Sequence, residues 1–144
     1  MTTVIKLGGS LLEPQASPVL LAALARVARQ TDLVLVHGGG KALSALLRRL
    51  DTPTEFRQGL RVTTPAVLEA ALMALAGETN TGLVAALQAA GLRAVGLTGC
   101  DAGLLRARRI PELGAVGGEP AADAALCRTL LAAGYTPVIA SLGM

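Results

Sequence analysis

Short apolar segments alternate with longer helical stretches along this chain, and this alternation limits the possible folds more than any other feature of the sequence. Continuous apolar runs predict buried strands at residues 4–7, 33–36, 94–97 and 137–140. Stretches rich in Ala and Leu predict helices at residues 19–29, 41–50, 66–76, 81–90 and 121–133. Strands that are apolar on both faces and separated by helices are typical of βαβ units. The sequence therefore predicts an α/β fold, with a mainly parallel sheet in an αβα sandwich.

Proline and glycine mark the expected ends of the helices. Ser17-Pro18 and Thr64-Pro65 each combine an N-cap residue with proline at the first helical position. Gly77, Gly91 and Gly134 are expected to end the helices that precede them. Gly77 should therefore separate the third predicted helix from the fourth.

Weaker β signals complete the prediction. A small hairpin is expected around Gly59, with its strands at residues 54–56 and 60–63. A turn at residues 98–103 is followed by weak β signals at 104–108 and 115–117. These segments lie between the helices and strands of the main sheet, so we expect them at its margin.

Composition bounds the possible partners. The chain has 144 residues, of which 52% are hydrophobic, which suits one domain with a real core. Only 1% are aromatic, and nucleic-acid bases stack on aromatic rings, so a nucleic-acid partner is not expected. The net charge of +3 is mild. Its one dense basic group, Arg106, Arg108 and Arg109, is expected in a solvated loop.

The sequence also argues against a membrane or a disulfide scaffold. No basic N-terminal region precedes a long apolar stretch, and no uninterrupted apolar segment approaches the roughly 18 residues of a membrane helix. Cys100 and Cys127 lie far apart without a CxxC motif, so we expect reduced thiols. We therefore expect a cytoplasmic protein without a membrane partner.

A lysine stands at the first of two glycine turns. Lys6 is one of only two lysines among the 13 basic residues, and it opens the run Lys6-Leu7-Gly8-Gly9-Ser10. Backbone N–H groups of Gly8 and Gly9 can approach an anion without a Cβ in the way, and a compact ammonium suits a phosphoryl group. A strand-to-loop turn with a surface lysine is the alternative. The run is neither a GxxxxGK[ST] loop nor a GxGxxG motif.

The second glycine turn is His37-Gly38-Gly39-Gly40, directly after the second predicted strand. Successive glycines at a helix N-terminus favour carboxylate or phosphate, and a plain tight turn seldom needs three of them. His37 is the only histidine. We interpret it as a hydrogen-bonded residue that holds the turn, and not as an acid–base catalyst. Because parallel strands bind ligands at their carboxyl ends, the two turns predict one anion site.

Two further polar residues are candidates. Arg61 lies in the second strand of the predicted hairpin, where it could bind a carboxylate bidentately or simply be exposed. Asn80 is interpreted as a helix cap. With one histidine and no nucleophile elbow, a Ser/His/Asp triad is excluded, and no pair of histidines is present for a metal site. The residue types point to phosphoryl transfer between small anionic molecules.

These segments together resemble the amino acid kinase family. The matching stretches are VIKLGGS, VLVHGGG, FRQGLRVT, GETN, AVGL, LGAVG and YTPVI, at residues 4–10, 34–40, 56–63, 77–80, 94–97, 113–117 and 135–139. They occur in the family's order and span nearly the whole chain. The run Gly59-Leu60-Arg61-Val62-Thr63 is the most specific, and it resembles the branch of the family that acts on N-acetylglutamate.

The resemblance implies ATP, with Mg²⁺ bound through it, as the phosphoryl donor. Lys6 would be the catalytic residue that stabilises charge on the transferred phosphoryl group. Gly8 and Gly9 would donate backbone N–H groups to the ATP phosphates. Catalysis of this kind consists mainly of positioning and charge stabilisation, and it needs no covalent protein intermediate.

The resemblance also implies the second substrate. Gly39 and Gly40 would hold the acylated amino acid, and Arg61, on a hairpin that acts as a lid, would bind its α-carboxylate. The side-chain carboxylate of N-acetyl-L-glutamate would attack the γ-phosphate of ATP and yield an acyl phosphate, a step of arginine biosynthesis.

In the family, a second half carries the adenine site, a second catalytic lysine, an aspartate that organises the lysines and an Asn-x-Asn segment. We therefore expect residues 1–144 to form one N-terminal substrate-binding and dimerisation domain, without the C-terminal nucleotide-binding domain, that is inactive alone and forms a homo-oligomer. One alternative is a kinase for another acylated amino acid, such as carrier-protein-bound aminoadipate. A non-catalytic ligand-binding or dimerising module is the other.

Overall fold

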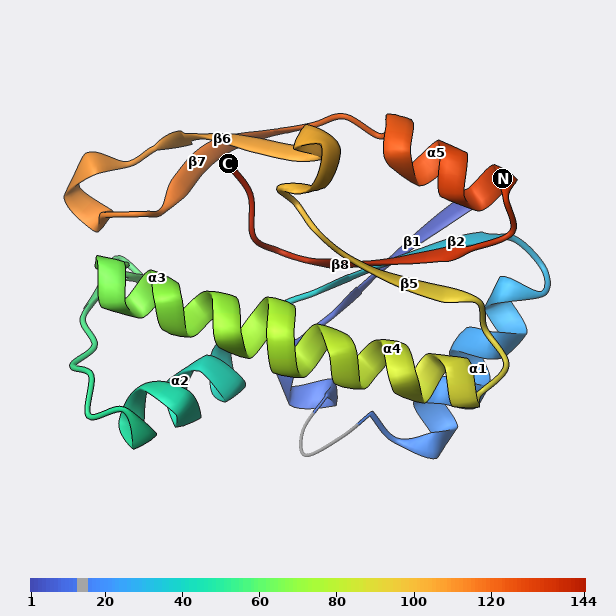
Figure 1. Cartoon of the computed structure of the whole chain (residues 1–144), viewed down its shortest axis with the longest axis horizontal. Coiled ribbons are helices and arrows are strands. Elements are labelled where there is room, and N and C mark those ends of the chain that lie inside the picture. The colour runs from blue at the N-terminus through green and yellow to red at the C-terminus, as the bar shows by residue number, and fades with distance from the viewer. Residues whose placement is uncertain (13–15) are drawn as a thin grey trace.

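The computed structural model of this chain describes residues 1–12 and 16–144. Its centre is a four-stranded sheet in the order β1-β2-β8-β5 (Figure 1). The strands are β1 (Thr2–Leu7), β2 (Asp32–His37), β5 (Ala94–Thr98) and β8 (Thr136–Ala140). Every neighbouring pair is parallel, which confirms the predicted sheet. The carboxyl ends of all four strands consequently lie at one edge.

Helices cover both faces of this sheet, as the sandwich prediction requires (Figure 1). One face carries α1 (Pro18–Ala28), α2 (Gly40–Arg49), α3 (Pro65–Ala71) and α4 (Asn80–Ala89), and the other carries α5 (Ala125–Ala132). On the first face Leu24, Leu35 and Leu87 share one buried cluster. On the second face Cys127 of α5 is buried with Val34 and Ile139.

The predicted starts of two helices are confirmed by their caps. The Ser17 side chain accepts a hydrogen bond from the Leu20 N–H at 3.2 Å, and α1 begins at the next residue, Pro18. The Thr64 side chain accepts from the Val67 N–H at 3.3 Å, at the start of α3. Each cap satisfies a backbone donor that a helix start otherwise leaves unpaired.

The predicted helix end at Gly77 is wrong. One continuous helix runs over Pro65–Ala89, and its central part, η2 (Leu72–Thr79), is a π-helix. Gly77 does not adopt the positive φ of a C-cap glycine. A mid-helix glycine costs only about 1 kcal/mol relative to alanine, and burial of Ala74 and Leu75 in the core offsets that cost.

The continuous helix is longer than any apolar helix that the sequence predicted. By length and composition alone it could cross a membrane, with a mean hydropathy of 1.3 over its most apolar window. However, Val67, Ala74 and Leu87 on this helix are buried in the protein core. A packed core helix passes the same test of length and composition.

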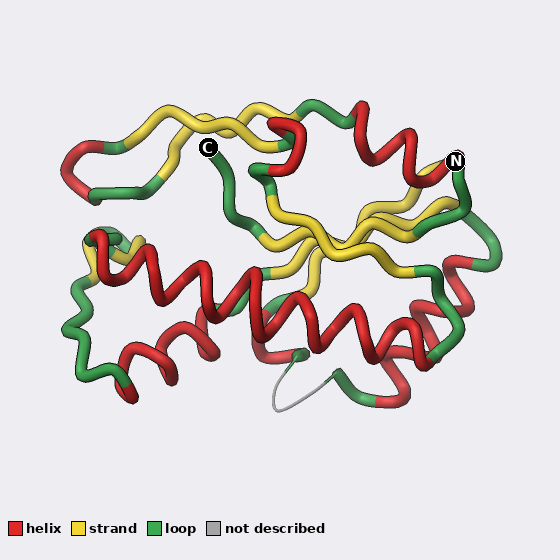
Figure 2. The backbone as a smooth tube through the Cα atoms, viewed as in Figure 1, coloured by secondary structure: helices red, strands yellow, loops and turns green. Residues whose placement is uncertain are grey.

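Two antiparallel hairpins stand beside the sheet (Figure 2). The first joins β3 (Phe56–Arg57) to β4 (Leu60–Arg61), and both turn residues, Gln58 and Gly59, have positive φ. This is the backbone of the tight turns that suit two-residue hairpin loops. The predicted hairpin is confirmed, although its strands are shorter than expected.

The second hairpin joins β6 (Leu105–Arg109) to β7 (Gly117–Ala122) through η4 (Pro111–Leu113). Its strands extend beyond the weak signals in the sequence because both are largely exposed, and an exposed strand needs no continuous apolar run. As a result α5 begins at Ala125, later than predicted, and the group of arginines at residues 106–109 lies on a strand instead of a loop. Two short 3-10 helices, η1 (Gly9–Leu11) and η3 (Asp101–Gly103), complete the described fold.

Candidate functional site

The two glycine turns meet at the carboxyl ends of β1 and β2. Leu7 pairs with His37 at the end of the two strands, and the Gly38 N–H donates to the Leu7 carbonyl at 3.3 Å. A Cβ on Gly9 would lie 3.5 Å from the Gly40 nitrogen. Residues that are distant in sequence are therefore brought together, as the parallel arrangement predicted.

Glycine at residue 39 is required by close packing. Gly39 is the N-cap of α2, and a Cβ there would approach the Leu75 side chain to 3.1 Å. Gly38 and Gly40 face open space instead, with nothing within 4 Å of an added Cβ. Gly39 has no side chain that could cap α2, so the first N–H groups of this helix need another partner. A helix N-terminus of this kind attracts an anion.

Lys6 lies at the last-but-one position of β1, where its backbone pairs with Val36. Its side chain is exposed, whereas the neighbouring Leu7 is buried in the core. Alternation along the strand thus directs the ammonium away from the main helix layer. Gly8, the next residue on the same face, has only the Ser10 hydroxyl near an added Cβ, at 4.0 Å.

His37 is fully buried and holds the second glycine turn. Its Nδ1 lies 3.0 Å from the Gly38 carbonyl oxygen, and its Nε2 lies 2.9 Å from Nδ2 of Asn80. Nδ2 of an amide can only donate, so Nε2 accepts and Nδ1 carries the proton that it donates to Gly38. Burial lowers the pKa of His37, and the Gly38 hydrogen bond only partly opposes this. A neutral, turn-holding histidine agrees with the interpretation from the sequence.

Asn80 is not the simple helix cap that the sequence suggested. It lies within the continuous helix, is buried, and its Nδ2 also donates to the Val138 carbonyl at 2.9 Å. The side chain therefore connects the helix to β2 and β8. A Cβ at Gly96 would collide with the Asn80 Oδ1, so β5 needs glycine at that position. The sequence carried no signal for this contact because its partners come from three separate segments.

Arg61 lies beside the start of α2. Its Nη2 donates to the Ser44 hydroxyl at 2.6 Å, and that hydroxyl donates to the Gly40 carbonyl at 2.8 Å. The guanidinium also stacks on the Phe56 ring, 4.5 Å from its centroid. Partial burial lowers the pKa of Arg61. The remaining N–H donors of its planar fork are suited to a carboxylate.

Ser44 is a site residue that sequence reasoning missed. Serine at this position of a helix commonly bonds to the carbonyl four residues earlier, so its presence alone gave no signal. Here the hydroxyl hydrogen is used by Gly40, which leaves the oxygen lone pairs for Arg61. Ser44 therefore links the arginine to the glycine turn.

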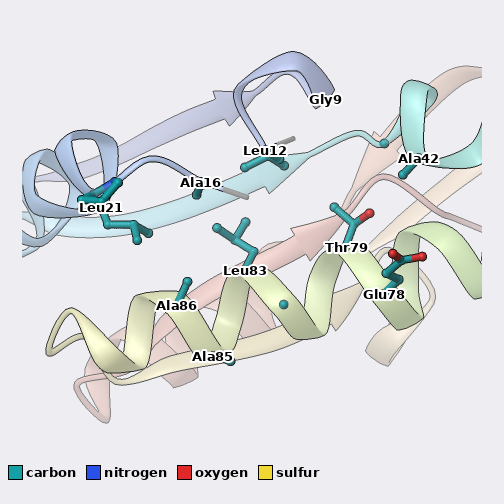
Figure 3. A pocket seen from close by; sticks show the side chains of 13 residues that line it. Gly9, Leu12, Ala16, Leu21, Ala42, Glu78, Thr79, Leu83, Ala85 and Ala86 are labelled. Atoms are coloured by element: carbon teal, nitrogen blue, oxygen red, sulfur yellow. The ribbon is translucent and has the colours of Figure 1, made fainter. Parts of the chain in front are cut away.

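Beside the turns lies an apolar pocket of about 600 Å³, lined by residues of η1, α1, α2 and the long helix (Figure 3). Leu12, Leu83 and Ala86 project into it, with Glu78 at one end. Gly9 and Gly39 of the two glycine turns also line it. Among the described residues, neither Lys6 nor Arg61 lines it. The pocket thus borders two of the predicted ligand glycines, whereas the two predicted cationic ligands lie outside its lining.

The chain is similar to known proteins over nearly its whole length. The family model described as "Amino acid kinase family" matches residues 1–144. The acetylglutamate kinase of Geobacillus kaustophilus is 46% identical over 146 residues, which cover 99% of this chain and 56% of the relative. That of Chloroflexus aurantiacus is 44% identical over 152 residues, covering 100% of this chain and 59% of the relative. The chain therefore spans little more than half the length of these relatives.

Solved structures are also similar. The smu.665 protein of Streptococcus mutans has a TM-score of 0.90 at 27% identity, covering 99% of this chain and 59% of that protein. An N-acetylglutamate synthase of Neisseria gonorrhoeae, complexed with coenzyme A and N-acetyl-glutamate, has a TM-score of 0.74 at 27% identity. That match covers 99% of this chain and 34% of the synthase.

Proposed function

This chain belongs to the amino acid kinase family, and we propose that it forms the substrate-binding part of an enzyme that phosphorylates the side-chain carboxylate of N-acetyl-L-glutamate. The observation that carries this proposal is the link from Arg61 through Ser44 to Gly40. It sets a guanidinium with several N–H donors beyond the one bonded to Ser44 beside a glycine turn at a helix N-terminus, which suits a ligand with a carboxylate. The names of the related kinases, and the N-acetyl-glutamate complex of the similar synthase, support the same ligand.

Each proposed ligand contact follows from the position of the residue. Arg61 would hold the α-carboxylate bidentately, and its stacking on Phe56 would keep the guanidinium plane fixed. Backbone N–H groups at Gly39 and Gly40 would bind the rest of the acylated amino acid, because the space beside Gly40 is open. This arrangement would orient the side-chain carboxylate toward the first glycine turn.

The residues at the end of β1 fit a nucleotide phosphate. Gly8 leaves room for close approach to its backbone, and the exposed Lys6 ammonium lies on the same face of the strand. ATP, with its Mg²⁺, would supply the phosphoryl group, and the product would be an acyl phosphate. Lys6 would stabilise the negative charge on the phosphoryl group during transfer, and Gly8 and Gly9 would donate N–H groups to the phosphates.

The rest of the enzyme is part of the same proposal. Because this chain spans about half of its relatives, we propose that it is a substrate-binding and dimerisation domain that needs a nucleotide-binding half for activity. A cytoplasmic location and a homodimer are further expectations. Leu72 and Met73 of the long helix are half exposed and would be available for an apolar contact between copies.

Calorimetric titration of the purified chain with N-acetyl-L-glutamate tests the proposal. We expect saturable binding that is lost in Arg61→Ala. The matched control is Arg93→Ala, because Arg93 also stacks on an aromatic ring, Tyr135, at 4.1 Å, but beside α5 and away from the glycine turns. Equal loss of binding in both variants, or no binding to the folded wild-type chain, would count against N-acetyl-L-glutamate as the ligand of this half.

A further inference from the structure

The tip of the β6–β7 hairpin contacts the segment that follows Arg61. The Thr63 N–H donates to the Leu113 carbonyl at 2.8 Å, and the Ala115 N–H donates to the Thr63 carbonyl at 2.8 Å. The two segments thus form a short parallel bridge between Thr63 and Gly114. In Figure 2 the small β3–β4 hairpin lies at the start of the long helix, below the tip of the β6–β7 hairpin.

Glycine is required at the centre of this bridge. Gly114 has a φ of 75°, a conformation that side chains other than glycine rarely adopt. A Cβ on Gly114 would also collide with the Thr63 carbonyl oxygen. The close approach of the two backbones therefore depends on the absence of a side chain at this residue.

The tip of the β6–β7 hairpin is itself braced. Arg109 of β6 donates from Nε to the Gly114 carbonyl at 2.8 Å. On the other side of the bridge, Arg57 of β3 donates from Nη1 to the Glu112 carbonyl at 3.2 Å. Two backbone hydrogen bonds and the Arg57 bond therefore join the two hairpins, and the Arg109 bond braces the β6–β7 tip from within.

The β3–β4 hairpin cannot hold its own position. Each of its strands has two residues, and Phe56 and Leu60 are 58% and 46% exposed. A two-stranded hairpin is marginal by itself, so external contacts must set its position. On the far side, the Ser44 hydroxyl accepts a hydrogen bond from the tip of the Arg61 side chain and not from its backbone. The backbone is held at Thr63, whose hydroxyl also donates to the Arg61 carbonyl at 3.1 Å.

We propose that the β6–β7 tip positions the hairpin that carries Arg61, and that Gly114 is a positioning residue for binding of a ligand carboxylate. For the identity of the ligand this inference rests on the proposed function. We call the two backbone hydrogen bonds that join Thr63 to Leu113 and Ala115 the clamp. The clamp holds the Arg61 backbone in place before the ligand arrives, so that the hairpin loses less conformational freedom when the ligand binds. Loosening the clamp weakens binding although Gly114 does not touch the ligand.

The first test measures the clamp without any ligand. Gly114→Ala is compared with Gly91→Ala in the full chain, because Gly91 has a φ of 89° but nothing within 4 Å of an added Cβ. Both variants force alanine into a positive φ, and only one disturbs Thr63. We expect hydrogen exchange at the Thr63 amide to be faster by about tenfold or more in Gly114→Ala only. Unchanged exchange, or equal acceleration in both variants, would overturn the clamp.

The second test measures its consequence for the ligand. By calorimetry, the affinity for N-acetyl-L-glutamate should fall by about tenfold in Gly114→Ala and stay at the wild-type value in Gly91→Ala. Faster Thr63 exchange with unchanged affinity would refute the positioning role. If the wild-type chain does not bind this ligand, the proposed substrate is wrong, while the exchange measurement still decides whether the clamp exists.

A milder variant covers the case in which Gly114→Ala does not fold. Arg109→Met removes the bond to the Gly114 carbonyl and keeps an unbranched, apolar side chain on an exposed strand residue. It should accelerate Thr63 exchange and lower the affinity in the same direction, by a smaller factor. Wild-type exchange in Arg109→Met, together with wild-type affinity, would contradict the proposal.

Discussion

Asn80 holds the ring of His37 from the long helix, with Nδ2 of the amide 2.9 Å from Nε2 of the imidazole. Both side chains are buried, and the same amide nitrogen donates to the Val138 carbonyl. His37 in turn donates to the carbonyl of Gly38, the first residue of the second glycine turn. The turn that we propose as a carboxylate site is therefore tied to the protein core by buried hydrogen bonds.

Replacement of Asn80 by alanine should lower the free energy of unfolding by about 1–3 kcal/mol, because it leaves His37 Nε2 and the Val138 carbonyl without their donor. Urea denaturation measures this change. Gln88→Ala is the control, since Gln88 lies on the same helix and its amide also bonds to a backbone carbonyl, but at a more exposed position. A similarly small decrease in the free energy of unfolding in both variants would mean that the buried Asn80 hydrogen bonds stabilise the protein no more than an exposed one.

Gly96→Ala should also destabilise the protein by at least about 1 kcal/mol, because the added Cβ would collide with the Asn80 Oδ1. We expect Gly82→Ala to have the opposite effect on stability. Gly82 lies within α4 with nothing within 4 Å of an added Cβ, so alanine there should stabilise the helix by up to about 1 kcal/mol. Thermal unfolding of the two variants should shift the midpoint in opposite directions, and shifts of the same sign would contradict the packing described.

Stability should depend on pH through His37. Its pKa in the folded protein is below the ordinary value of 6.5, so the unfolded chain binds the proton more readily. The part of the free energy of unfolding that depends on a neutral His37 is thus fully present above pH 6.5. It is lost as the pH falls toward the pKa of His37 in the folded protein. Denaturant midpoints measured from about pH 7.5 down to about pH 5.5 should fall. A His37→Asn variant should lack this component, and an identical pH profile in that variant would rule His37 out as the cause.

Ser44→Ala should weaken binding of N-acetyl-L-glutamate by about three- to tenfold, because Arg61 loses the hydroxyl that holds it beside Gly40. Calorimetry measures the affinity. Thr129→Val is a control that removes the same kind of bond, from a helical hydroxyl to the carbonyl four residues earlier, in α5. The affinity should remain at the wild-type value in Thr129→Val, and an unchanged affinity in Ser44→Ala would show that Arg61 does not need this support.

The purified chain alone should show no detectable phosphorylation of N-acetyl-L-glutamate. The family resemblance assigns further transition-state contacts to a second half, and one such contact is worth about 3–4 kcal/mol. ADP release in the presence of N-acetyl-L-glutamate and Mg-ATP measures the reaction. Turnover that disappears in Lys6→Ala would show instead that this chain suffices for catalysis.

Local features of the sequence were enough to predict the elements that depend on near neighbours. The caps at Ser17 and Thr64 and the strands before both glycine turns are confirmed, because a cap needs only the next helical turn and a buried strand needs only a run of apolar residues. The helix end predicted at Gly77 was wrong because the continuation of this helix depends on residues that are distant in the chain. A glycine predicts a helix end only where packing does not hold the helix together, and packing cannot be seen in a local pattern.

The sequence by itself determined the parallel α/β architecture, the two glycine turns and the residue types from which an anion site can be built. Only the tertiary structure decided that Ser44 supports Arg61, that Asn80 holds His37, and that Gly114 lies against Thr63. In each of these pairs the partners are distant in the chain, and what joins them is a single hydrogen bond or a close backbone approach. Such contacts have no periodicity and no fixed spacing, so they exist as constraints only once the chain has packed.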